Sequence, residues 1–153
     1  MTTTQPRPAP QGTNLLALDQ QVCYALAVAS RNVIALYKPL LEPMGLTHPQ
    51  YLVMLALWEE TPLTVSELGR RVSLDPGTMS PLLKRLEVGG LITRARDPKD
   101  ERALAVSLTP RGARLRARAE KVPPAILARL GMEVTELESL RDGLTRLIAA
   151  ARS

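Results

Sequence analysis

The chain is poor in the residue types that most chemical sites need. Its 153 residues include one Cys, one His and no Phe. A single Cys excludes a disulfide framework within the chain and is typical of a reducing compartment. One His leaves too few soft ligands for a zinc site, so we expect no metal and no cofactor. There is also no evident group of Cys, His and acid residues for catalysis, which argues against an enzyme such as a thiol peroxidase.

Long apolar segments and aromatic residues are scarce as well. No apolar run reaches about 18 residues and none near the N-terminus resembles a signal peptide, so we expect a soluble, cytoplasmic protein without a membrane span. Aromatic residues make up only 3% of the chain. The core must therefore be mostly aliphatic, which suits helices better than strands.

Positive charge is concentrated in the middle of the chain. The formal net charge is +5, and residues 69–121 carry 13 Lys or Arg against 6 Asp or Glu. Such a basic segment is typical of a protein that binds a polyanion. An ordinary solvated surface explains the charge equally well when charge is the only evidence.

Apolar periodicity predicts helices at both ends of the chain. Residues 1–13 are rich in Pro and polar residues, and we interpret them as a flexible arm. Apolar residues at steps of three and four predict a long helix from about residue 14, ended or kinked by Pro39 and Pro43. A buried helix is expected over about 49–60. Pro123 and Pro124 are expected to interrupt the helix that starts at Pro110.

The last predicted helix has a near-heptad apolar stripe from Val134 to Ile148. Such a stripe has no obvious partner inside a small domain. Packing against a second copy of the chain is the simplest way to bury it, so we expect a homodimer. An ordinary intramolecular helix is the alternative.

Two short helices in the basic segment have the pattern of a helix-turn-helix. Thr64 and Glu67 form a capping box, Asp75 is a natural N-cap for the second helix, and Gly89 and Gly90 close that helix. Small, hydroxyl and basic residues occupy its outward face, and such a face fits the major groove of DNA. These candidate DNA-binding residues are Thr78, Ser80, Pro81, Lys84 and Arg85. Two amphipathic helices without a DNA-binding role would give the same pattern.

The next segment predicts a β-hairpin with "DPKD" at its turn and Leu104, Val106 and Leu108 pointing inward. A basic hairpin directly after a helix-turn-helix is typical of a wing that reaches the DNA minor groove. Its candidate DNA-binding residues are Arg94, Arg96, Asp100 and Arg102, and we expect the Asp100 carboxylate to bind the Arg102 side chain. The expected fold class is mainly α with a small β-hairpin wing: a winged helix-turn-helix plus a helical dimerisation region (α+β). The expected partner is double-stranded operator DNA.

The segments "LTVSELGRRVSLDPGTMSPLLKRLEVGGLITR" and "DERALAVSLTPRG" resemble the MarR family of dimeric winged-helix repressors, and the resemblance covers roughly residues 18–150. It implies a single domain over residues 14–153. Within that domain, dimerisation helices are implied at about 14–45 and 110–151, and the winged helix at about 46–109.

A narrower resemblance concerns "LDQQVCYAL", "LYKPLL", "THPQYLVMLALWE" and "RDPKDER", which are similar to the organic hydroperoxide resistance regulators of that family. It implies that Cys23 is a peroxide sensor and that Tyr37 contacts it across the dimer. Ala27 stands where the subfamily often has Tyr, and His48 replaces another frequent Tyr. We expect Tyr24 and His48 to compensate for the missing ring.

Helix geometry supports a contact between subunits. Cys23 and Tyr37 are 14 residues apart, about 21 Å along one helix, and nearly four full turns keep both on one face. An antiparallel copy of this helix brings each Cys23 near the partner's Tyr37. If Asp19 caps the helix, Cys23 lies just after the first turn, where the positive end of the helix dipole favours a thiolate. If the helix starts earlier, near Asn14, that effect fades.

The resemblance implies a repressor that leaves DNA when an organic hydroperoxide oxidises Cys23 to a sulfenic acid. The oxidised Cys23 then has three fates: a mixed disulfide with a low-molecular-weight thiol, further oxidation, or an intersubunit disulfide. Two other readings stay open. By residue type alone, a lone helical Cys is more often an inert small hydrophobe. The protein is alternatively a repressor that responds to a non-covalent small aromatic ligand.

Overall fold

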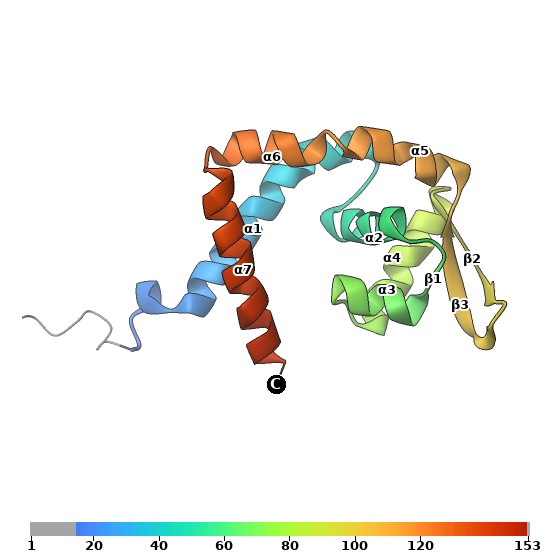
Figure 1. Cartoon of the computed structure of the whole chain (residues 1–153), viewed down its shortest axis with the longest axis horizontal. Helices are drawn as coiled ribbons and strands as arrows, with labels where there is room; N and C mark the ends of the chain where they lie inside the picture. Colours follow the sequence, from blue (N-terminus) through green and yellow to red (C-terminus); the bar gives the residue numbers. More distant parts are fainter. Residues whose placement is uncertain (1–14, 153) are drawn as a thin grey trace, which may run out of the picture. The chain divides into compact units, whose positions relative to one another are not determined.

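The computed structural model describes residues 15–152, so the expected arm over residues 1–13 lies outside the described part. The chain divides after Ala35 into two compact units. Helices dominate the structure, and one small antiparallel sheet lies in the second unit (Figure 1). The expected fold class, mainly helical with a β-hairpin wing, is confirmed.

The first unit holds a short 3-10 helix, η2 (Leu18–Gln20), and most of α1 (Val22–Leu41). Gln21 separates them, because its extended backbone (φ −84°, ψ 120°) breaks the helical path. The long helix therefore begins at Val22, eight residues later than expected. It also continues through Pro39, so that Pro does not end it, whereas Pro43 lies in the next 3-10 helix, η3 (Glu42–Met44).

The remaining elements of the second unit follow in close succession. They are α2 (His48–Glu59), β1 (Leu63–Thr64), α3 (Val65–Val72), α4 (Pro76–Val88), β2 (Ile92–Asp97), β3 (Asp100–Leu108), α5 (Pro110–Ala119), α6 (Val122–Leu130) and α7 (Val134–Ala151). Four of these helices begin with a side-chain cap, at Thr47, Thr64, Asp75 and Thr109. Such caps satisfy backbone N–H groups that have no partner inside a helix.

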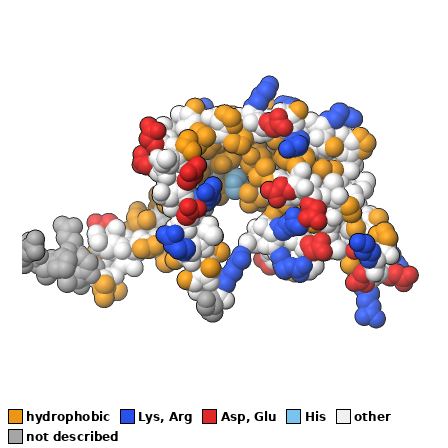
Figure 2. All heavy atoms as spheres, viewed as in Figure 1, with side chains coloured by type: hydrophobic (Ala, Val, Ile, Leu, Met, Phe, Trp, Pro, Cys, Tyr) orange, Lys and Arg blue, Asp and Glu red, His pale blue; other side chains and the backbone are white. Residues whose placement is uncertain are grey.

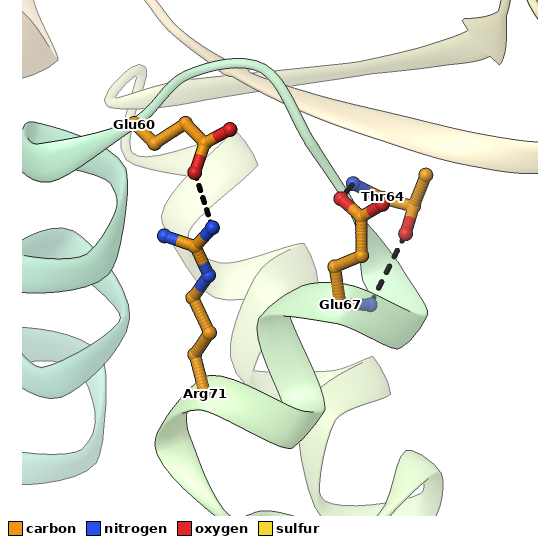
Figure 3. Close-up of polar contacts among 4 residues, drawn as sticks. All are labelled: Glu60, Thr64, Glu67 and Arg71. Atoms are coloured by element: carbon orange, nitrogen blue, oxygen red, sulfur yellow. Dashed lines mark hydrogen bonds and ion pairs between the residues drawn. The ribbon is translucent and has the colours of Figure 1, made fainter.

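The predicted capping box at the start of α3 is confirmed. The Thr64 hydroxyl accepts from the Glu67 N–H at 3.1 Å, and the Glu67 carboxylate accepts from the Thr64 N–H at 3.2 Å (Figure 3). On the same helix, Arg71 pairs with Glu60, which follows α2 in the chain. These contacts fix where α3 starts and tie it to the end of α2.

The sheet has three antiparallel strands in the order β1-β3-β2. The predicted hairpin is confirmed, with Pro98 and Lys99 at its turn. Strand β1 was not predicted, because two residues are too few to show an alternating pattern. Leu104 is 44% exposed, so its expected inward position is wrong. The reason is that β1 covers β3 only at Ala105 and Val106 and leaves the outer half of the hairpin uncovered.

The core of the second unit is aliphatic, as the composition predicts. Its fully buried side chains include Met54 and Leu57 of α2, Leu68 of α3 and Leu83 of α4. Packing of α5 onto this core depends on Gly112, where an added Cβ would lie 2.1 Å from the Leu91 carbonyl oxygen. The Trp58 indole N–H donates to the Gly112 carbonyl at 2.9 Å across the same contact. The helix α5 is thereby held against α2 and the base of the hairpin.

The last two helices differ from expectation in one detail and leave apolar surface uncovered. The break between α5 and α6 falls at Glu120 and Lys121, and Pro123 and Pro124 lie in the first turn of α6, where Pro is tolerated.

Helix α7 buries none of its residues. Its exposed apolar side chains are Val134, Leu140, Leu147 and Ile148. Figure 2 shows hydrophobic atoms on the surface over α6 as well, where Leu127 is exposed.

Candidate nucleic-acid interface and redox site

The helix α4 buries one face and exposes the other. Its Met79, Leu82, Leu83 and Leu86 are buried, as the spacing i, i+3, i+4, i+7 predicts. The exposed side carries the candidate residues Thr78, Ser80, Pro81 and Lys84. The helix continues through Pro81, and Lys84 makes no ion pair among residues 15–152.

Thr78 has a structural role at the start of α4. Its backbone N–H donates to one oxygen of the Asp75 carboxylate at 2.8 Å, and its hydroxyl donates to the other at 3.1 Å. These hydrogen bonds lower the pKa of Asp75. The Thr78 hydroxyl is thus engaged in the cap, which leaves the Ser80 hydroxyl as the freer of the two for a ligand.

The structure brings together candidate residues from the two separate motifs. A groove of about 980 Å³ runs between α3, α4 and the hairpin. Ser80 of α4, Arg94 of β2 and Arg102 of β3 all line it. Arg85 does not line this groove and instead lines a second cleft, between α4 and α5. The turn of the helix explains the difference, because five residues rotate a side chain by about 140° around the axis.

Arg94 is fixed to the end of α4 rather than free at the hairpin surface. Its Nε and Nη2 each lie 3.3 Å from one oxygen of the Glu87 carboxylate, a two-point contact. The hydrogen bond and charge of Arg94 lower the pKa of Glu87. This ion pair links β2 to α4 and sets the angle between the hairpin and the helix.

The tip of the hairpin is shaped by two acidic residues that bind backbone. Asp97 accepts from the Lys99 N–H at 2.9 Å, and Asp100 accepts from the Arg102 N–H at 3.0 Å. The expected contact between the Asp100 carboxylate and the Arg102 side chain is therefore wrong. Arg96 and Arg102 are exposed and make no ion pair with any residue in the described range 15–152. Figure 2 shows basic and acidic side chains together at this tip.

Cys23 is exposed and is the second residue of α1. Asp19 belongs to η2 and does not cap α1. Cys23 therefore lies inside the first turn, closer to the positive end of the helix dipole than the sequence alone indicated. The neighbouring Tyr24 is 43% exposed. Tyr37 lies 14 residues further along the same helix, about 21 Å away at helical rise.

Tyr37 forms an aromatic cluster with His48 and Tyr51 of α2. The ring centroids of Tyr37 and His48 are 5.1 Å apart in an edge-to-face arrangement, and those of Tyr37 and Tyr51 are 5.8 Å apart. Burial raises the pKa of Tyr37 and lowers the pKa of His48. At neutral pH the Tyr37 phenol therefore keeps its proton and the imidazole is uncharged. Sequence reasoning missed Tyr51, although its position three residues after His48 places both on one helix face.

Within residues 15–152 there is no group of three or more His, Cys, Asp or Glu side chains that could hold a metal ion. Over the same residues, no helix is both long enough and apolar enough to cross a membrane.

A helix-turn-helix followed by a two-stranded hairpin defines a winged-helix module within the second unit. The model of the MarR family matches residues 46–104, which run from the start of α2 to the middle of β3. The chain belongs to the MarR family of winged-helix transcriptional regulators.

One curated relative is the organic hydroperoxide resistance transcriptional regulator of Bacillus subtilis (strain 168). It is 42% identical over 133 residues, which are 87% of this chain and 90% of that protein. Among solved structures, reduced AbfR bound to DNA has a TM-score of 0.75 and 31% identity, and the match covers 94% of this chain and 100% of AbfR. Overoxidised AbfR bound to DNA has a TM-score of 0.70 and 36% identity, covering 90% of this chain and 99% of AbfR. AbfR is a protein of Staphylococcus epidermidis.

Proposed function

We propose that this protein is a homodimeric repressor that binds operator DNA while Cys23 is reduced and leaves it when an organic hydroperoxide oxidises Cys23. The observation that carries the proposal is the position of Cys23, the only cysteine, exposed in the first turn of α1. A relative that is 42% identical is an organic hydroperoxide resistance regulator, which supports the same reading.

The DNA-binding surface consists of the exposed side of α4 and the hairpin. Helix α4 enters the major groove, where Ser80 and Lys84 face base edges and phosphates. The hairpin is the wing, and Arg96 and Arg102 extend from it toward the minor groove. AbfR, which has the same fold, was solved bound to DNA, and this supports the assignment.

The dimer is formed by the helices outside the winged module, over about residues 14–45 and 110–151. The apolar side chains of α7 that are left exposed in a single chain support this division. Exposed apolar patches of this extent are typical of protein interfaces. The winged helix over about 46–109 then belongs to one MarR-type domain that needs its partner copy for two-fold DNA binding.

The sensing reaction is a two-electron oxidation of sulfur. The Cys23 thiolate attacks the outer oxygen of the hydroperoxide, the O–O bond breaks, and the organic part leaves as an alcohol after taking a proton. The sulfur becomes a sulfenic acid. A low-molecular-weight thiol then attacks the sulfenic sulfur, which gives a mixed disulfide and water. A second molecule of thiol reverses the change by thiol–disulfide exchange.

Release from DNA follows from the bulk added at Cys23. We place Cys23 at the dimer seam, facing Tyr37 of the opposite copy, so that a mixed disulfide displaces the helices and changes the spacing of the two α4 helices. DNA binding by a dimer depends on that spacing. Overoxidised AbfR was solved bound to DNA, which favours a bulky adduct over oxidation of sulfur alone as the releasing form.

The test is operator binding titrated with cumene hydroperoxide in the presence of a small thiol, for wild type beside Cys23→Ser. We expect equal DNA affinity before treatment and release of the wild type only. Glu59→Cys in the Cys23→Ser background is a positional control, since it places an exposed thiol at the end of α2, outside the proposed dimer helices. A Cys23→Ser dimer that leaves DNA as readily as wild type contradicts the proposal and favours the alternative, a response to a non-covalent small aromatic ligand.

A further inference from the structure

The cleft between α4 and α5 is rich in arginine and lies outside the DNA-binding surface described above. It has a volume of about 540 Å³. Its charged lining residues are Arg85 of α4, Arg111, Arg114 and Arg118 of α5, and one acid, Glu42. Glu42 is exposed and lies 3.9 Å from Lys38, so part of its charge is already offset. The cleft thus has an excess of positive charge that nothing in the described chain neutralises.

The three arginines of α5 occupy one helix face, since positions i, i+3 and i+7 point the same way. Two of them are held in place by backbone. Arg111 donates to the Gly89 carbonyl at 3.1 Å, and Arg118 donates to the Pro43 carbonyl at 3.1 Å. A guanidinium has five N–H donors, so each keeps most of them free. Arg111 and Arg118 are therefore already positioned at the cleft before a ligand binds.

Gln50 adds a donor at the floor of the cleft. It lines the cleft and is only 7% exposed. Its Oε1 accepts from the Thr47 N–H at 2.9 Å, which leaves the Nε2 group without a hydrogen-bond partner among residues 15–152. No fully buried side-chain nitrogen or oxygen in that range lacks a partner, so the Nε2 group must reach the open space of the cleft. A buried amide donor surrounded by guanidinium groups is suited to an acceptor-only anion.

We propose that this cleft binds phosphate groups, with Arg85, Arg114 and Arg118 contacting the oxygens and Gln50 Nε2 donating to one of them. Guanidinium groups match phosphate oxygens in a two-point geometry, and a charged ligand relieves the repulsion among neighbouring arginines. The volume fits a small molecule with two or more phosphate groups. The phosphates have two possible sources, a free polyphosphate compound and the DNA backbone.

The location of the cleft favours a free polyphosphate compound over the DNA backbone as the source of the phosphate groups. Gly89 and Leu91 line the cleft at the base of the hairpin, next to the start of β2. The tip at Pro98 and Lys99 follows the other end of β2, about 20 Å from Ile92 at the rise of a strand. A duplex that meets the wing tip lies at the far end from the cleft. A ligand in the cleft contacts the C-terminal part of α4, so it acts on DNA binding through the position of that helix.

The probe is inorganic pyrophosphate, titrated into the full-length dimer by calorimetry at constant ionic strength. Gln50→Glu keeps the oxygen that caps α2 but removes the Nε2 donor and adds a negative charge, so we expect pyrophosphate binding to weaken by about tenfold or more. Arg114→Gln is expected to weaken binding by a similar factor. Arg116→Gln is the matched control, because this exposed arginine of α5 does not line the cleft. Circular dichroism verifies that each variant is folded.

Operator binding against salt concentration separates the two sources. In one outcome, wild type does not bind pyrophosphate, and Arg114→Gln lowers the slope of log affinity against log salt concentration by about one unit while Arg116→Gln does not. The phosphates bound in the cleft are then those of the DNA backbone, and the site is supported in that form. If neither pyrophosphate binding nor the salt slope distinguishes Gln50→Glu and Arg114→Gln from Arg116→Gln, the phosphate site is overturned. Neither result depends on Cys23, so this inference stands or fails apart from the sensing mechanism.

Discussion

The Arg94 guanidinium makes a two-point contact with the Glu87 carboxylate, with both nitrogen–oxygen distances at 3.3 Å. This contact joins the first strand of the wing to the last turn of α4. The contact therefore connects the two elements that we assign to the minor and major grooves.

The ion pair predicts a pH dependence of stability. Because Arg94 lowers the pKa of Glu87 in the folded state, Glu87 stabilises the protein above the ordinary pKa of a glutamate. That contribution is lost as the pH falls through the lowered value. We expect Glu87→Gln to be less stable than wild type at pH 7, with the difference shrinking below about pH 4.5. Urea unfolding at fixed protein concentration measures the difference, and Glu59→Gln, an exposed acid at the end of α2 and outside the proposed dimer helices, is the control. A difference in unfolding free energy between wild type and Glu87→Gln that stays constant with pH contradicts the ion pair with Arg94.

Close packing at Gly112 predicts a large effect from one methyl group. An added Cβ would overlap the Leu91 carbonyl oxygen, so α5 must shift, and we expect Gly112→Ala to lose about 1–3 kcal/mol or more. Because Trp58 donates to the Gly112 carbonyl, its fluorescence reports the same shift.

The sequence predicted those features that depend on neighbours in the chain. The capping box of Thr64 and Glu67 and the cap at Asp75 were found because each cap lies three residues from its partner. The start of α1 was missed because Gln21 is not a capping residue and η2 continues the helical pattern before it. The ion pair of Arg94 with Glu87 and the turn of Arg85 toward α5 depend on how elements pack, which local pattern does not encode.

Replacing Arg102 in the wing is expected to lower DNA affinity without lowering the stability of the fold. Arg102 is exposed and its side chain has no ion pair in the described structure, so Arg102→Ala should leave unfolding unchanged. We expect operator binding to weaken by about 1–3 kcal/mol if the side chain contacts DNA. Asp100→Ala should act differently, since it removes the acceptor for the Arg102 N–H and loosens the turn. Fluorescence anisotropy with labelled operator measures both, and unchanged affinity for Arg102→Ala removes the wing from the interface.

Sequence preference is expected to come from α4. Replacing Ser80 with Ala should change which operator sequences are preferred more than it changes binding to random DNA, because a base-edge contact carries the sequence information. Lys84→Ala should weaken both by a similar factor if it contacts phosphate. Thr78→Ala is expected to act mainly through stability, since its hydroxyl is engaged by Asp75. Competition binding against randomised operators separates these effects, and an unaltered preference in Ser80→Ala would mean that another element reads the bases.

Tyr37 is expected to assist Cys23 of the partner copy without being essential. Burial raises the pKa of Tyr37, so its phenol keeps a proton that it can donate to a thiolate at neutral pH. Tyr37→Phe preserves the ring that packs on His48 and Tyr51 but removes that donor. We expect unchanged operator affinity and a slower oxidation of Cys23. The decrease is at most about ten- to hundredfold, because one hydrogen bond to a charged group contributes about 1.5–3 kcal/mol. Stopped-flow loss of free thiol under cumene hydroperoxide measures the rate. Tyr24→Phe is measured beside it, because Tyr24 is the tyrosine expected to compensate for the ring missing at Ala27. An equal rate for Tyr37→Phe and wild type would show that the Tyr37 hydroxyl takes no part in sensing.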